Sequence, residues 1–260
     1  MKQRILLLSM TLTCCALHAA TDVNRAKAIA ELSGENSIFF LEHADDFMWD
    51  YLEKLPEKYG LRKDELSSVL GDVALQTIGQ TNTLANYVRR GAVEALGRYG
   101  TRAQLPILEK VALRNDIHAA PSACRVYSEI ATQDEYLALV GRIFDGEGGW
   151  DKRGKAIVNN KLWRVLKHGG DEKKPKIMDF LRLRVAAETN AVNMVSFDCL
   201  LSEFDASYAG SRERMLNIGR AIKSDKSVDA RTLALLVKAL ESTRDQILEK
   251  EGRPAAEDKR

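Results

Sequence analysis

The sequence predicts an all-α protein, a right-handed solenoid of stacked helix pairs preceded by a cleaved signal peptide. Apolar residues recur at intervals of three and four along the chain, which is typical of amphipathic helices. The segment 88–111 nearly repeats 31 residues later. A repeated helix–turn–helix cannot bury its apolar stripe alone, so the copies are expected to stack. The short apolar start of the chain predicts export.

The first twenty residues, 1–20, have the pattern of a secretory signal peptide. Lys2 and Arg4 give a positive start, and an apolar run and small residues follow, ending at Ala20. The run is shorter than the roughly 20 residues that span a bilayer. We therefore expect an exported chain, periplasmic or secreted, with no transmembrane segment after cleavage. Lipoprotein anchoring through Cys15 is the alternative.

Residues 21–82 are expected to form an N-terminal helical region. The apolar spacing predicts helices over 22–33, 37–55 and 63–78. The Pro56–Gly60 segment is expected to end the second of them, because proline and glycine interrupt helices.

Residues 83–186 are expected to form the repeat core. Its first copy is two short helices, and Thr101-x-x-Gln104 forms a capping box at the start of the second helix. A third copy lies at an offset of 70 residues, where Asp171 replaces Thr101 as a good N-cap. The offsets make three residues equivalent inward positions: Leu96, Tyr127 and Leu166.

Residues 187–251 are expected to contain a fourth, less regular helix pair and a closing helix. Ser211 is the predicted cap of the second helix of that pair, and the closing helix is predicted over 228–249. The polar segment 252–260 is expected to be a disordered tail.

The segment VRRGAVEALGRYGTRAQLPILEKVAL resembles a HEAT-like repeat of the short kind. The matching residues are Arg89 or Arg90, Ala92, Ala95, Leu96, Gly97, Gly100, Pro106 and Leu108. The second copy departs from the pattern, since Ser128 and Ala131 replace the glycines. The resemblance implies an armadillo-type solenoid that binds a partner, and it transfers no catalytic residue.

The composition limits the class of partner that the chain can bind and the number of thiols that it can use. Removal of Lys2 and Arg4 leaves 37 basic residues against 37 acidic ones, so the basic excess typical of nucleic-acid binding is absent. Only Cys124 and Cys199 remain after the signal peptide. Both lie in apolar helical contexts, and we expect two buried free thiols.

Motifs for catalysis, cofactors and metals are weak, so no catalytic, cofactor or metal residue is assigned. Gly149 to Lys155 has the glycine and lysine spacing of a P-loop, but Ala156 replaces the Ser or Thr, and a helix is expected upstream instead of a strand. The nearest approach to metal-ligand spacing is His43 with Asp46, on a helix face expected to be solvated.

Charge is unevenly placed, with an acidic stretch over 31–57 and a basic one over 151–184. One interpretation is ordinary solvated helix faces. The other is a dipolar solenoid that docks an acidic partner or associates with further copies of itself. In HEAT arrays the second helix of each pair lines the concave wall, which implies a partner-binding surface. Its candidate residues are Lys110, Arg114, Arg142, Lys173, Lys176 and Arg184, with Trp150 on the glycine-rich insertion as an aromatic anchor at the rim.

We therefore expect an exported, non-catalytic binding or scaffold protein that uses a helical-repeat surface for protein–protein interaction. The alternatives are an enzyme of unknown type with a dispersed site on the solenoid, and a purely structural lipoprotein domain.

Overall fold

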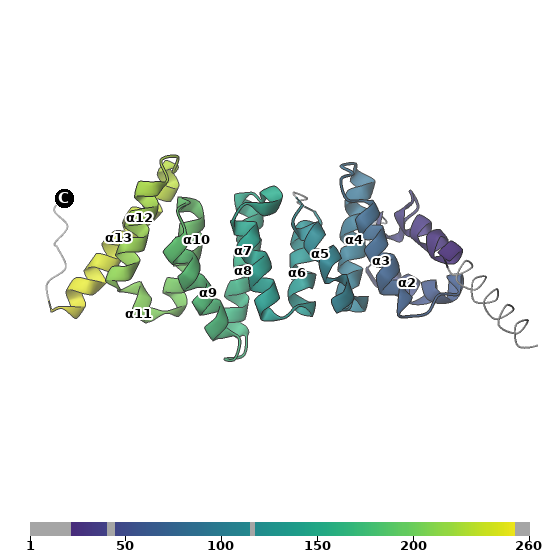
Figure 1. Cartoon of the computed structure of the whole chain (residues 1–260), viewed down its shortest axis with the longest axis horizontal. Coiled ribbons are helices and arrows are strands. Elements are labelled where there is room, and N and C mark those ends of the chain that lie inside the picture. The colour runs from purple at the N-terminus through teal and green to yellow at the C-terminus, as the bar shows by residue number, and fades with distance from the viewer. Residues whose placement is uncertain (1–21, 41–44, 115–117, 253–260) are drawn as a thin grey trace, which may run out of the picture. The chain divides into compact units, whose positions relative to one another are not determined.

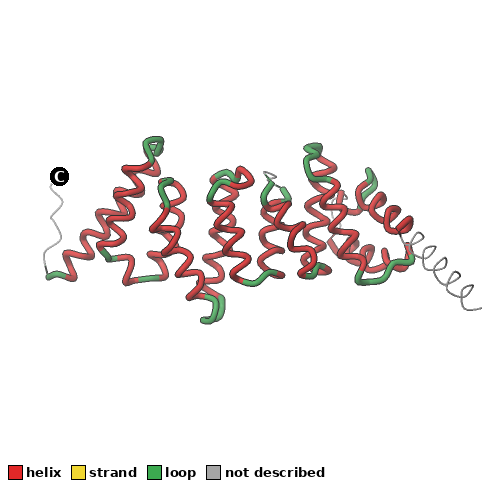
Figure 2. The backbone as a smooth tube through the Cα atoms, viewed as in Figure 1, coloured by secondary structure: helices red, strands yellow, loops and turns green. Residues whose placement is uncertain are grey.

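The computed structural model of this chain describes residues 22–40, 45–114 and 118–252. These residues form α-helices and short 3-10 helices without any strand (Figure 2), which confirms the all-α class for this part of the chain. Every helix within it is too short or too polar to traverse a lipid bilayer. The expected signal peptide with Cys15, the His43 segment and nearly all of the tail lie outside the described residues.

The chain divides into two compact units, residues 1–132 and 133–260. Unit 1 begins with a helical segment over 22–33. It continues with η1 (Ile38–Phe40), α2 (Asp45–Tyr59), α3 (Glu65–Gln76), α4 (Thr83–Tyr99), η2 (Arg102–Gln104), α5 (Leu105–Ala112) and α6 (Ala120–Ile130).

Unit 2 contains the remaining elements, labelled in Figure 1. They are α7 (Gln133–Phe144), η3 (Glu147–Gly149), α8 (Lys152–His168), α9 (Lys174–Ala187), α10 (Ala191–Phe204), α11 (Ala206–Ala209), α12 (Arg212–Ser224) and α13 (Ala230–Lys250). The division between the units falls between the two helices of the second expected copy.

Alternate helices pack on one another within each unit. In unit 1, α3 contacts α5 and α4 contacts α6, while in unit 2, α7 contacts α9 and α8 contacts α10. First helices of the expected pairs thus meet first helices, and second helices meet second helices. This pattern is consistent with stacking of sequential helix pairs.

The inward positions and two of the caps agree with the sequence. Leu96, Tyr127 and Leu166 are buried, with 0, 5 and 2 % of their surface exposed. Thr101 and Gln104 form the expected capping box, and the hydroxyl of Ser211 accepts a hydrogen bond from the backbone N–H of Arg214. These short-range features depend on residues close in sequence.

The second helix does end within the expected Pro56–Gly60 segment, but its expected end at residue 55 was wrong, because Pro56 does not interrupt it. Helix α2 runs through it to Tyr59 and stops at Gly60, which has a φ of +60°. The N–H of Gly60 donates to the carbonyl of Glu57, and that of Leu61 donates to the carbonyl of Pro56. This is a Schellman motif, and it needs a left-handed residue that glycine supplies without steric cost. Burial of Leu52 and Leu55 on the same helix offsets the hydrogen bond that Pro56 removes.

Two further expectations need correction. Asp171 does not cap α9, whose N-cap is Lys173; its carboxylate instead accepts a hydrogen bond from Lys174 at 2.9 Å. Cys124 is buried and free as expected, and burial raises the pKa of its thiol to about 12. Cys199 is free but exposed, because its neighbours Asp198 and Leu200 take the inward positions of α10.

Candidate functional site

The seven candidate binding residues fall into both units. Lys110 and Arg114 lie on α5 and just after it, in unit 1, and both are exposed. The other five, Arg142, Trp150, Lys173, Lys176 and Arg184, belong to unit 2. Contacts inside unit 2 place Lys173 and Lys176 on an exposed surface and Arg184 in a partly buried cluster, while Arg142 and Trp150 pack against their own neighbourhoods in the chain.

The exposed surface joins the start of α7 to the start of α9. Lys176 forms an ion pair with Asp134, with 2.7 Å between Nζ and Oδ2. Gln133 donates from Nε2 to the backbone carbonyl of Lys173 at 2.5 Å. We call these four residues the α7–α9 surface. Its side chains reach water, so its polar contacts can be exchanged for contacts to another molecule.

Arg142 is tied to the turn that follows its own helix. Its guanidinium donates to both carboxylate oxygens of Glu147, at 2.6 and 2.5 Å. These hydrogen bonds lower the pKa of the exposed Glu147 carboxyl. The bidentate pair orients the Arg142 guanidinium toward this turn.

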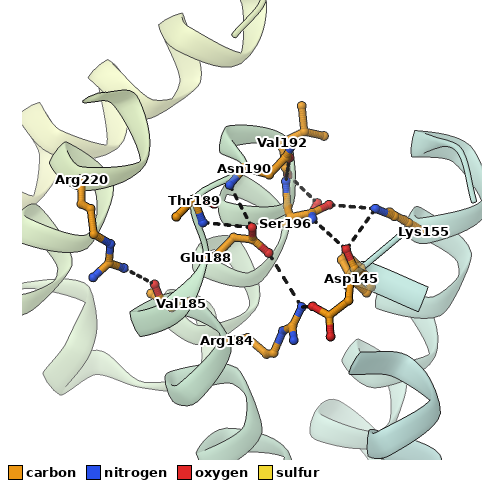
Figure 3. Close-up of polar contacts among 12 residues, drawn as sticks. Asp145, Lys155, Arg184, Val185, Glu188, Thr189, Asn190, Val192, Ser196 and Arg220 are labelled. Atoms are coloured by element: carbon orange, nitrogen blue, oxygen red, sulfur yellow. Dashed lines mark hydrogen bonds and ion pairs between the residues drawn. The ribbon is translucent and has the colours of Figure 1, made fainter. Parts of the chain in front are cut away.

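Arg184 belongs to the interior cluster drawn in Figure 3. Its guanidinium lies 2.6 Å from Asp145, 3.9 Å from Glu188 and 5.6 Å from the centroid of the Phe197 ring. Only a fifth of the side chain is exposed. This arginine therefore holds the ends of α7 and α9 and the face of α10 together, and it presents little surface to a partner.

Lys155, the lysine of the P-loop spacing, enters the same cluster (Figure 3). Its Nζ donates to Asn193 Oδ1 at 3.2 Å and to the Phe144 carbonyl at 3.4 Å. Partial burial lowers its pKa, against the attraction of Glu188. The element upstream is the helix α7, as expected. We call Asp145, Lys155, Arg184, Glu188 and Asn193 the Lys155 cluster, and its contacts position α8 and α10 within unit 2.

Trp150 does not form an exposed aromatic anchor at the rim of the candidate surface. Only 9 % of its surface is exposed. A Cβ atom built on Gly154 would lie 2.6 Å from its ring, so the indole packs directly on the first turn of α8. Asp151 accepts a hydrogen bond from the Gly154 N–H there, which caps the helix. The loop folds back onto α8, and most of the indole is inside the protein.

The acids that face the candidate bases were not predicted from the sequence. Asp145 precedes Arg184 by 39 residues, and Asp134 precedes Lys176 by 42. The second and third expected copies are offset by 39 residues, the difference between the offsets of 31 and 70. This offset could have indicated the pairs, because residues about 39 apart on and after α7 and α9 are neighbours in unit 2.

Metal-ligand types do not gather within the described residues, which hold no group of three or more His, Cys, Asp or Glu side chains arranged to bind an ion. Comparisons with protein-family models, with curated proteins and with solved structures gave no match to this chain.

Proposed function

We propose that this chain is an exported, non-catalytic HEAT-like protein that binds a protein partner through the second helices of its stacked pairs, as a scaffold in the cell envelope or outside the cell. The observation that carries the proposal is the side-by-side packing of α7 and α9, with exposed charged side chains along their shared edge. Side-by-side helices of this kind offer an extended surface for recognition.

The α7–α9 surface is the part of the candidate wall that supports binding best. Lys173 and Lys176 are exposed, and the pair that Lys176 makes with Asp134 is also exposed. Such a pair contributes about 0–1 kcal/mol, so a carboxylate of a partner can replace Asp134 at little cost. An acidic partner bound in this way is held less tightly as salt rises. Lys110 and Arg114 offer comparable exposed bases on unit 1.

Affinity capture with a matched pair of variants tests the proposal. The tagged chain, expressed in its native host, is cross-linked and recovered from the envelope and the medium, and the bound proteins are identified by mass spectrometry. Lys173→Glu/Lys176→Glu should lose the partner that the wild type captures. Arg184 is left intact because its interior contacts support the fold.

The control variant is Lys54→Glu/Lys63→Glu in unit 1. It makes the same charge change on exposed lysines and also removes one surface ion pair, between Lys54 and Asp50. It should retain the partner. Equal capture by both variants would reject the α7–α9 surface.

The intact mass of the recovered chain tests export. It should correspond to a chain that begins near residue 20 or 21. A full-length chain confined to the cytoplasm would reject export.

A further inference from the structure

The outer side of α8 is rich in basic side chains. Residues 152–168 contain six Lys or Arg and neither Asp nor Glu. One side of this helix is buried, at Val158, Leu162 and Leu166. With about 3.6 residues per turn, Arg164 lies on the opposite side. We call the exposed and half-buried side chains around it the α8 face, which consists of Ile157, Asn160, Lys161, Arg164, Lys167 and His168.

The bases of the α8 face are not neutralised by acids of the protein. Lys161 and Arg164 form no hydrogen bond or ion pair among the described residues. Lys167 lies over the ring of Trp163, with 4.4 Å between Nζ and the ring centroid. Glu203 of α10 adds one acid at the flank, where its carboxylate accepts a hydrogen bond from Trp163 Nε1 at 2.9 Å. The face therefore keeps positive charge that an anion outside the chain can neutralise.

Aliphatic and uncharged side chains accompany these bases. Ile157, with 49 % of its surface exposed, belongs to the α8 face itself. Helix α10 packs against α8, and Val192, Val195 and Cys199 of α10 are half-buried or exposed. Their intervals of three and four residues place them on one stripe, which we call the α10 stripe. Bases beside exposed aliphatic side chains are typical of helices that lie at a membrane surface.

This combination favours an anionic lipid surface over a nucleic acid. The phosphate backbone of a nucleic acid attracts Lys and Arg, but it gives no site for exposed aliphatic side chains. The headgroup region of a bilayer accepts both, because aliphatic side chains enter it while bases contact anionic headgroups. The acceptors that Lys161 and Arg164 lack within the described residues would then be supplied by lipids, which diffuse to them.

We propose that the α8 face binds an anionic membrane surface through Lys161, Arg164 and Lys167, with Ile157 and the α10 stripe at the bilayer interface. Helices α8 and α10 contact each other in one row of unit 2, and α7 and α9 contact each other in the other row. The inference therefore does not depend on the proposed partner binding at the α7–α9 surface.

Sedimentation with vesicles tests the proposal. The purified chain should bind vesicles of phosphatidylcholine that contain about a quarter phosphatidylglycerol, and should not bind vesicles of phosphatidylcholine alone. Binding should weaken as salt rises, because salt screens the surface potential. Arg164→Glu/Lys167→Glu should weaken binding at least about tenfold, since each base near an anionic surface contributes to the attraction.

The matched control is Lys173→Glu/Lys176→Glu, which makes the same charge change on exposed lysines of the α7–α9 surface. It should bind the anionic vesicles as the wild type does. Any contribution of residues 1–20 is the same in all three proteins, and circular dichroism confirms that the variants remain helical. In the affinity capture described above, Arg164→Glu/Lys167→Glu should retain the protein partner, so failure of one proposal is distinguishable from failure of the other.

A fluorescent label tests whether the α10 stripe reaches the bilayer. In a Cys14→Ser/Cys15→Ser background, Cys199 is the exposed thiol and Cys124 is buried. An environment-sensitive dye on Cys199 should shift its emission to the blue when anionic vesicles are added. The same dye on Lys173→Cys, in a chain that also carries Cys199→Ala, should not shift.

Three results would overturn the proposal. The first is equal vesicle binding by the wild type and Arg164→Glu/Lys167→Glu, and the second is no vesicle binding by the wild type at low salt. The third is binding of single-stranded DNA, lost in Arg164→Glu/Lys167→Glu, by a chain that does not bind the vesicles. That result would assign the α8 face to nucleic acid instead of lipid.

Discussion

Arg214 of α12 and Asp198 of α10 form a buried ion pair in unit 2. The guanidinium donates from Nε and Nη2 to the two carboxylate oxygens, at 2.9 and 2.7 Å, and Tyr208 donates its hydroxyl to the same carboxylate at 3.1 Å. Both charged side chains are at least nine-tenths buried. A buried pair of this kind stabilises little by itself, but a lone buried charge is very costly.

Arg214→Met should therefore lower the free energy of unfolding by about 3–5 kcal/mol, because it leaves the Asp198 carboxylate buried without its cation. The double variant Asp198→Asn/Arg214→Met removes both charges and should recover part of that loss. Arg125→Met breaks an exposed pair with Glu129 and should cost no more than about 1 kcal/mol. Urea unfolding measures all three. A double variant less stable than Arg214→Met would show that buried charge is not the cause.

Asp205 gives the clearest pH dependence at the residue scale. Burial alone would raise its pKa, but hydrogen bonds from Arg182 and Ser207 and from the Tyr208 N–H outweigh it and hold the pKa at about 2. A carboxyl whose pKa is lowered by folding adds stability above its unfolded value near 4, and that stability is lost as pH falls to 2.

Asp205→Asn should consequently cost up to about 2 kcal/mol at neutral pH and reduce the loss of stability between pH 4 and 2. Half of the Arg182 side chain is exposed, so solvent screening places the cost below that limit. Asp134→Asn, at an exposed carboxylate, serves as the control for the loss of one charge. Thermal melts from pH 2 to 7 provide the measurement. If Asp205→Asn keeps the full acid sensitivity of the wild type, this carboxyl does not supply it.

Among the elements, two helix caps that depend on neighbouring residues were predicted correctly, whereas the end of the second helix and the cap of α9 were not. The Thr101–Gln104 capping box and the Ser211 cap rest on residues three apart, and the structure has both. Pro56 remains inside α2 because buried leucines hold that turn in place. Asp171 lies too far ahead of α9 to cap it, because the chain makes a turn over residues 171–173 before the helix begins.

The candidate site could also be predicted only in part from the sequence. Its bases could be chosen from the sequence by their place on second helices, and Lys110, Arg114, Lys173 and Lys176 are exposed. The low exposure of Arg184 depends on packing against Phe197 of α10, which the sequence pattern does not connect to it, whereas Trp150 is covered by a local contact with Gly154, four residues later. Exposure follows from the tertiary neighbours of a residue, which a helical period alone does not specify.

For the whole molecule, the helix packing gives physical meaning to the sequence offsets. The contacts of α7 with α9 join residues 39 and 42 apart in the sequence, close to the difference of 39 between the two sequence offsets.

Titration of the captured partner against the wild type and Lys173→Glu/Lys176→Glu, at low and at moderate salt, tests the central claim most directly. At low salt the variant should bind at least about tenfold more weakly, roughly 1.4 kcal/mol. The difference should shrink as salt screens the exposed charges. Equal dissociation constants for the two proteins at both salt concentrations would contradict partner binding through the second helices.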